Sequence, residues 1–279
     1  MKGIMLQGTA SHVGKSIITT AICRMLARQG FQISPFKAQN MTSHHVMLDT
    51  GQELAISQYE QAQAAKRKAE PWMNPVLLKP LENMQTEVFF DGESQGIITG
   101  ARFKDMYYQK ALQKIKQGLI QAANNSDFII IEGAGSPVEM NLKERDLSNM
   151  AIAELADVSV LLVADIERGG VFASIVGTLA LLTEKERSCV KGIIINKFTG
   201  HSSLFVEGVE WLENNTGIPV VGVLPFIEHQ LNEEDSFDGR DQPFQPNLTS
   251  KEADFEKLAD HVEANIDREK LLEIMRGTD

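Results

Sequence analysis

The sequence lacks a long apolar segment, an excess of basic residues and more than two cysteines. No apolar run approaches the ~20 residues of a membrane span, and the stretch before Gly8 is too short for a signal peptide. The formal net charge of −11 gives no electrostatic reason to expect nucleic-acid binding, which calls for a basic face. Cys23 and Cys189 have no zinc-ligand spacing and are expected to be reduced packing residues. We therefore expect a cytoplasmic protein that binds neither a membrane nor nucleic acid.

The composition that remains is that of a globular protein. Of its 279 residues, 43% are apolar and 23% are charged. This length suffices for one large α/β domain, or for one domain with a small appendage. Because the net charge is negative, an anionic ligand would have to be held by local lysines, backbone amides and a metal ion.

The N-terminal segment 2–29 has the pattern of a strand, a loop of small residues and an amphipathic helix. In a phosphate-binding loop, backbone N–H groups surround a polyphosphate, a lysine reaches the β- and γ-phosphates, and a serine ligates Mg²⁺. Lys15 and Ser16 fit these two roles. Five residues rather than the usual four separate Gly8 from Gly14, so an ordinary glycine-containing turn remains the alternative.

Two more candidate residues follow predicted parallel strands. Residues 31–37 form a strand that ends at Lys37, and the apolar run 128–131 precedes Glu132. Ligands in such sheets bind beyond the carboxyl ends of the strands. Lys37 is therefore either a ligand-binding residue or a solvated strand-end lysine. Glu132 is placed to hold Mg²⁺, directly or through water.

Further apolar runs alternate with helical segments, at 158–164, 190–196 and 219–224. We predict about six parallel strands with helices on both faces, the α/β architecture of P-loop NTPases. A helix is expected at 102–124, after a strand, a turn and a second strand. Residues 71–80, with three prolines, should be extended.

Several polar residues have two interpretations. Glu53 is expected in the first turn of a helix over 51–69, where its carboxylate either complements the helix N-terminus or ligates a metal. Asp146 is either the N-cap of the next helix or a site residue. His44 and His45 lie in a predicted polar loop, and their adjacency disfavours a shared zinc ion.

The C-terminal region differs in character from the rest. We divide the chain into a P-loop domain, 1–232, and an acidic linker with a C-terminal amphipathic helix, 233–279. Residues 252–275 form one or two helices with a break near Asp267. Their apolar stripe must be covered either by this domain or by a partner.

Several segments together resemble the ATP-binding domain of cobyric acid synthase. They are GTASHVGKS, PFKAQNM, MNPVLLKP, EGAGSPVEMNL, VADIERGGVFAS, INKF and the LP at 224–225. The resemblance covers about residues 2–235. It implies the fold that cobyrinic acid a,c-diamide synthase and dethiobiotin synthetase share, which we describe as dethiobiotin synthetase-like.

The resemblance implies an ATP- and Mg²⁺-dependent amide ligase of cobalamin biosynthesis. In that family, ATP phosphorylates side-chain carboxylates of a corrinoid, adenosylcobyrinic acid a,c-diamide, and ammonia displaces phosphate to give cobyric acid. Full-length members carry a glutaminase domain with a nucleophilic cysteine. Neither Cys23 nor Cys189 stands in a glycine-flanked elbow, so ammonia would come from a missing or separate glutaminase domain or subunit. We also expect a homodimer.

The resemblance also implies roles for individual residues. Lys15, Lys37 and Glu132 would be catalytic, and Ser16, Glu53 and Glu132 would hold the metal. The expected ATP-binding residues are Thr9, His12, Val13, Gly14, Lys15, Ser16, Ile17, Asn196, which would read the adenine edge, and Pro225. The expected substrate residues are Gln39, Asn40, Lys79, Gly135, Ser136 and Asp146.

Two other functions compete with this one. A dethiobiotin synthetase-like ligase would act on a carbamate, although the QNM segment after Lys37 disfavours it. A partition-type ATPase would instead be a nucleotide switch whose terminal helix docks on a partner.

Overall fold

The computed structural model describes residues 1–99, 103–141, 143, 146–200, 202–232 and 251–277. The strands are β1 (Gly3–Gly8), β2 (Ile33–Phe36), β3 (Gln39–Met41), β4 (His45–Met47), β5 (Glu53–Ala55), β6 (Val76–Pro80), β7 (Gln85–Phe90), β8 (Glu93–Thr99), β9 (Phe128–Glu132), β10 (Ser159–Asp165), β11 (Val190–Phe198) and β12 (Val220–Pro225). The helices are α1 (Lys15–Arg28), α2 (Ile56–Ala64), α3 (Phe103–Asn124), α4 (Met150–Ala156), α5 (Val171–Leu181), α6 (Glu184–Cys189), α7 (Val206–Thr216), α8 (Glu252–Asn265) and α9 (Arg268–Arg276).

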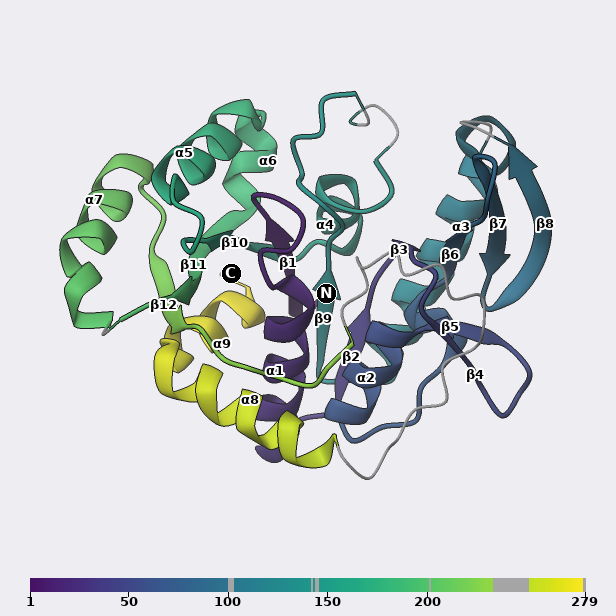
Figure 1. The fold of residues 1–279 in the computed structure, drawn as a ribbon, viewed down its shortest axis with the longest axis horizontal. Coiled ribbons are helices and arrows are strands. Elements are labelled where there is room, and N and C mark those ends of the chain that lie inside the picture. Colours follow the sequence, from purple (N-terminus) through teal and green to yellow (C-terminus); the bar gives the residue numbers. More distant parts are fainter. Residues whose placement is uncertain (100–102, 142, 144–145, 201, 233–250, 278–279) are drawn as a thin grey trace.

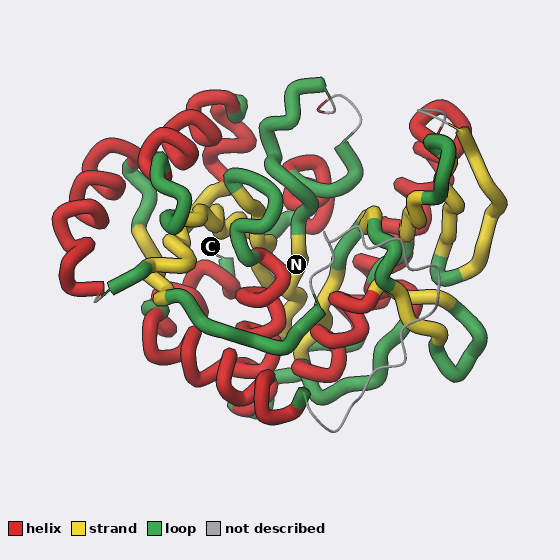
Figure 2. The backbone as a smooth tube through the Cα atoms, in the orientation of Figure 1, coloured by secondary structure: helices red, strands yellow, loops and turns green. Residues whose placement is uncertain are grey.

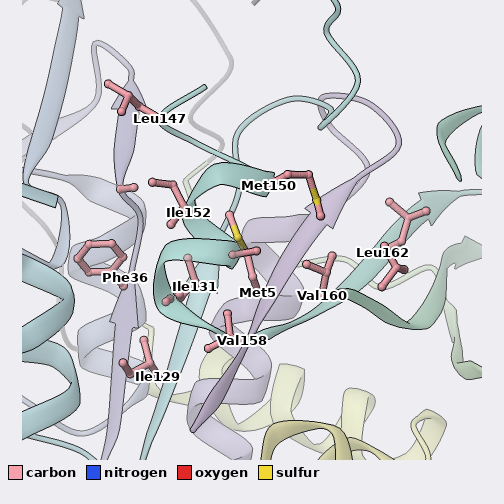
Figure 3. Close-up of a cluster of buried hydrophobic side chains, with 14 of the residues drawn as sticks. Met5, Phe36, Ile129, Ile131, Leu147, Met150, Ile152, Val158, Val160 and Leu162 are labelled. Atoms are coloured by element: carbon pink, nitrogen blue, oxygen red, sulfur yellow. The ribbon is translucent and has the colours of Figure 1, made fainter. Parts of the chain in front are cut away.

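A parallel sheet of six strands forms the centre, in the order β12-β11-β10-β1-β9-β2. Helices cover both faces of this sheet, which confirms the predicted architecture (Figures 1 and 2). Successive side chains of a strand point to opposite faces, so Met5 belongs to one buried cluster while Ile4 and Leu6 belong to the other. Figure 3 shows the first cluster, in which Met150 and Ile152 of α4 lie over the sheet.

The strand register determines which polar residues meet at the carboxyl edge of this sheet. Leu6 of β1 is paired with Glu132 of β9, two residues before the loop that starts at Gly8. Phe36 of β2 is paired with Ile131, so Lys37 follows level with Glu132. The loops after β1 and β9 lie on the same side of the sheet (Figure 1). Residues distant in the sequence are therefore brought to one place by backbone pairing alone.

The segment after β2 contains short strands that were not predicted, whereas the predicted strand, turn and second strand before α3 are confirmed as β7 and β8. Strand β3 pairs with β6, which continues through β7 to β8, and β4 pairs with β5. The predicted polar loop thus contains two strands, and Glu53 lies in a strand instead of in the first turn of a helix. Strands of three residues are too short to show a periodicity, and β3 depends on a partner far along the chain. The segment 71–80 begins with a 3-10 turn, Pro71–Met73, before β6.

The C-terminal helices pack on the domain itself. Helix α8 lies along α1 (Figure 1), and Phe255, Leu258 and Val262 join the buried cluster on that face of the sheet. The chain breaks between α8 and α9 at Ile266 and Asp267, as predicted. The apolar stripe is therefore covered by this chain. The predicted linker, 233–250, lies outside the described residues. Within the described part of the chain, no helix combines the length and apolarity needed to cross a membrane.

Candidate nucleotide and metal site

The loop between β1 and α1 has a backbone that requires glycine at its end. Gly14 has φ +97° and precedes the first residue of α1. A Cβ atom there would lie 2.1 Å from Nδ2 of Asn196. Asn196 donates a hydrogen bond from this nitrogen to the Val13 carbonyl at 2.8 Å. The loop is thus held against the end of β11, and only a residue without a side chain fits at its closest point.

Lys15 connects the two loops at this edge. Its Nζ atom donates to the carbonyl oxygen of Ala10 at 3.1 Å and to that of Gly135 at 3.1 Å. The residue is 7% exposed and lines a cavity between these loops. An ammonium group in this position, at the N-terminus of α1, favours the binding of an anion.

Glu132 is the centre of a buried polar cluster. Its Oε1 atom accepts hydrogen bonds from the Ser16 hydroxyl at 2.7 Å and from Lys37 Nζ at 2.8 Å. Its Oε2 atom accepts from Gln61 Nε2 at 2.5 Å. Glu132 is 1% exposed and Lys37 is 6% exposed. Burial of a carboxylate is costly unless it is paired and hydrogen-bonded, and these three donors meet that need.

A cavity of about 420 Å³ joins the predicted residues; we call it the central cavity. Its volume lies in the range typical of small-molecule sites. It is lined by nine residues from the predicted set, namely His12, Gly14, Lys15, Ser16, Ile17, Lys37, Asn40, Glu132 and Gly135. Arg168, Lys197, His229 and Asn232 also line it and were not predicted. The sequence signal for Lys197 is its place directly after Asn196 at a strand end, whereas the others depend on loop paths.

A second cavity of about 540 Å³ adjoins the first at the loop between β1 and α1; we call it the side cavity. Gly14, Ile17, Lys197 and His229 line both cavities. Asn196 lines only the side cavity, together with the exposed Phe226. The two spaces offer a polar compartment beside the loop and a separate one at the ends of β11 and β12.

Lys197, at the end of β11, holds the loop between β1 and α1 in place. It has a left-handed φ of +58°, and its Nζ atom donates to the His12 carbonyl at 2.8 Å and to Asp165 Oδ2 at 2.9 Å. Asp165 and Asn196 are register partners in β10 and β11. The strand ends thereby hold the loop through the backbone atoms of His12 and Val13.

Other predicted residues do not line the central cavity. Glu53 lies in the hairpin, with Oε2 at 3.4 Å from Nε2 of His45. The Asp146 carboxylate accepts the backbone N–H groups of Ser148, Asn149 and Ala151, before and at the start of α4. The N-cap prediction for Asp146 is wrong, because α4 begins after Asn149, three residues further along the chain. The remaining members of the predicted set outside this cavity are Thr9, Val13, Gln39, Lys79, Ser136, Asn196 and Pro225.

The oxygen atoms of Ser16 and Glu132 fit a magnesium site. Mg²⁺ binds oxygen ligands and commonly takes one or two carboxylates together with phosphate oxygens. Among the described residues, no three His, Cys, Asp or Glu side chains form a group that could hold a metal ion. Protein side chains alone thus supply too few ligands, and the arrangement suits a cation bound jointly with a polyphosphate.

Comparison with known proteins identifies a nucleotide-binding domain. Residues 4–236 match the protein family described as the CobQ/CobB/MinD/ParA nucleotide binding domain. The chain is 51% identical to a cobyric acid synthase of Crocosphaera subtropica over 238 residues, 85% of this chain and 48% of the relative. It is 47% identical to that of Rippkaea orientalis over 250 residues, 90% of this chain and 50% of the relative. The resemblance to cobyric acid synthase is thus confirmed, and the chain spans about half the length of these relatives.

Proposed function

Because this chain belongs to the CobQ/CobB/MinD/ParA nucleotide binding domain family, we propose that it is an ATP-dependent amide ligase of the cobyric acid synthase type. Its substrate would be a corrinoid, adenosylcobyrinic acid a,c-diamide, and its product cobyric acid. The observation that carries the proposal is the convergence of Ser16 and Lys37 on one oxygen of Glu132, beside Lys15 in the central cavity.

The chemistry requires an activated carboxylate. A carboxylate oxygen of the corrinoid attacks the γ-phosphorus of ATP, the bond from this phosphorus to the bridging oxygen of ADP breaks, and an acyl phosphate forms. Ammonia then attacks the carbonyl carbon, phosphate leaves, and loss of a proton from nitrogen gives the amide. Both steps need negative charge to be neutralised while the reactants are held in line.

The residues of the central cavity have distinct parts in this scheme. Lys15 and the loop amides would bind the β- and γ-phosphates, and Lys37 would neutralise the substrate carboxylate or the γ-phosphate. Ser16 and Glu132 would hold Mg²⁺, which supplies charge stabilisation when bound. Asn196 would read adenine in the side cavity. Glu53 lies in the β4–β5 hairpin and does not line the central cavity, so its binding of the metal has no support from the cavity lining and stays a prediction.

The competing functions are less well supported. The Asn40 and Met41 side of the central cavity belongs to the QNM segment that disfavours a dethiobiotin synthetase-like ligase. The switch hypothesis depended on a terminal apolar stripe free for a partner, and α8 packs that stripe against α1. A separate glutaminase remains part of the proposal, since about half of each relative lies outside the matched region. The homodimer also stays a prediction.

The test is direct. The protein is incubated with ATP, Mg²⁺, ammonium and cobyrinic acid a,c-diamide, and the corrinoid is analysed by mass spectrometry. We expect ADP to form together with a mass change equal to the replacement of a hydroxyl by an amino group for every amide. Diaminopelargonic acid with bicarbonate serves as the alternative substrate. An unchanged corrinoid mass with ammonium in excess would reject the proposal, and ADP release that depends on diaminopelargonic acid would favour the alternative ligase.

A further inference from the structure

Three buried amide side chains link the wall of the central cavity to Glu132. Asn40 Nδ2 donates to Gln58 Oε1 at 3.1 Å, Gln58 Nε2 faces Gln61 Oε1 at 3.5 Å, and Gln61 Nε2 donates to Glu132 Oε2 at 2.5 Å. Asn40 is 4% exposed, and Gln58 and Gln61 are fully buried. Asn40 and Glu132 both line the central cavity, so the amide chain runs behind its wall from one lining residue to the other.

The carboxylate determines the direction of this chain. An ionised carboxylate only accepts hydrogen bonds, so Gln61 must present its NH₂ group to Glu132. Its carbonyl oxygen then faces Gln58, which must turn its own NH₂ group toward Gln61 and its oxygen toward Asn40. Each amide thus has one consistent orientation, and reversal of any of them would place two donors or two acceptors together.

Burial of two glutamine side chains on α2 costs free energy, and this cost indicates that the two residues have a specific role. Gln58 and Gln61 are three residues apart and therefore share one helix face. Burial of an amide costs free energy that its hydrogen bonds only offset, and an apolar residue would pack on that face without this cost. What the glutamines provide is a fixed orientation of the Glu132 carboxylate, because Gln61 holds Oε2 while Ser16 and Lys37 share Oε1.

We propose that Gln61 is a positioning residue for Glu132, supported by Gln58, and that it sets the carboxylate for the metal ion bound with ATP. This inference rests on the proposed function for the identity of the nucleotide. A residue that hydrogen-bonds a metal-ligating carboxylate typically contributes 10- to 100-fold to metal affinity. The amide chain would act in this way from outside the cavity, without contact with substrate.

The experiment compares three glutamines of α2, each changed to methionine of similar size. Isothermal titration calorimetry gives the affinity for ATP with and without Mn²⁺, and the ratio of the two measures the contribution of the metal. We expect Gln61→Met to lower this ratio about 10-fold or more. Gln58→Met should lower the ratio less, because this change removes a contact of Gln61 but leaves the hydrogen bond from Gln61 to Glu132 in place.

Gln63→Met is the matched control, since this half-buried residue of the same helix has no side-chain hydrogen bond in the described part of the chain. It should leave the ratio unchanged. Gln61→Asn keeps an amide but shortens the side chain, so it should reproduce the loss if Gln61→Met does not fold. An unchanged ratio in folded Gln61 variants, or an equal loss of metal-free ATP binding, would overturn the inference alone. A wild-type protein that binds no ATP would instead refute the proposed function and this inference with it.

Discussion

The two ends of α1 present buried cations to very different surroundings. At the N-terminal end, Lys15 donates to backbone carbonyls of two loops and lines the central cavity. At the other end, Arg24 is fully buried, forms ion pairs with Glu252 and Glu256, and lies 5.5 Å from the ring centre of Phe255. Arg28, in the last turn, pairs with Glu256 at 3.2 Å, with Glu263 at 2.5 Å and with Asp260.

The difference shows that burial of a cation does not by itself identify a functional site. The carboxylates around Arg24 and Arg28 all belong to α8, and they attach one helix to another. The acceptors of Lys15 come from loops that also form a cavity wall, where an anionic ligand can replace or join them. Under the proposed function, the N-terminal end of α1 binds the nucleotide while the other end anchors α8, which predicts that substitutions at the two ends affect different measurements.

Lys15→Ala should have the largest effect, and it should fall on ATP binding and turnover and not on stability. Loss of a charge that stabilises the transition state typically costs about 100-fold or more in kcat. The fold should survive, because Lys15 acts on ligand charge and contributes little to packing. Steady-state ADP formation is measured beside the circular dichroism spectrum and Tm. Wild-type ADP production by a folded Lys15→Ala protein would contradict the role of the loop.

Arg24→Ala should show the reverse pattern. Truncation leaves a void against Phe255 and removes two ion pairs, for a loss of about 2 kcal/mol in the free energy of unfolding. The partner carboxylates are partly exposed, and water can solvate them after the change. Urea unfolding measures the loss, and kcat of the folded fraction should be unchanged. The control Glu252→Gln keeps a hydrogen-bond acceptor beside the buried guanidinium, which still pairs with Glu256, so it should cost less than Arg24→Ala does. A loss of kcat without a loss of stability would break the comparison.

Gly14→Ala tests the junction between the loop and α1. The added Cβ would meet Asn196 Nδ2, and alanine at φ +97° is strained by about 1–3 kcal/mol. We expect weaker ATP binding, by roughly 2- to 10-fold if half of that strain falls on the bound loop. Gly177→Ala is the control, because Gly177 is exposed in α5 with nothing near its Cβ position. That change should stabilise the protein by about 0.5–1 kcal/mol. Equal ATP affinity in both variants would show that the loop does not depend on Gly14.

The central sheet and the core of the site could be predicted because their signals are local. Buried parallel strands appear as continuous apolar runs, and a residue such as Glu132 or Lys37 directly after one must lie at the ligand-binding edge. The sequence pattern therefore identified both partners of the ion pair, although only the register of β2 and β9 makes them neighbours.

The β4–β5 hairpin, the pairing of β3 with β6 and the amide chain could not be predicted in the same way. Glu53 was expected in a helix because residues 51–69 have high helix propensity, but pairing of β5 with β4 overrides that propensity. Gln58 and Gln61 look like surface residues of an amphipathic helix. Their burial follows from the fit of α2 against Glu132, which depends on tertiary packing that a single sequence does not display.

The smallest expected effect concerns α8, where His261 contacts the end of β12. Its Nε2 atom lies 2.9 Å from the Pro225 carbonyl, and burial lowers the pKa of the imidazole below its ordinary value of 6.5. At a pH between the lowered pKa of the folded protein and 6.5, His261 is protonated in the unfolded chain and neutral in the folded protein. Stability from this residue is therefore present above pH 6.5 and is lost as the pH falls through that window. His261→Gln retains a donor for Pro225 but cannot titrate, so the difference in unfolding free energy between variant and wild type should change with pH only there. Helix α8 lines the side cavity through Asp254 and Lys257, which this change leaves in place, so ATP affinity at pH 7.5 should be equal in both proteins. A weaker affinity in the variant would show that the contact of His261 with Pro225 also shapes this cavity.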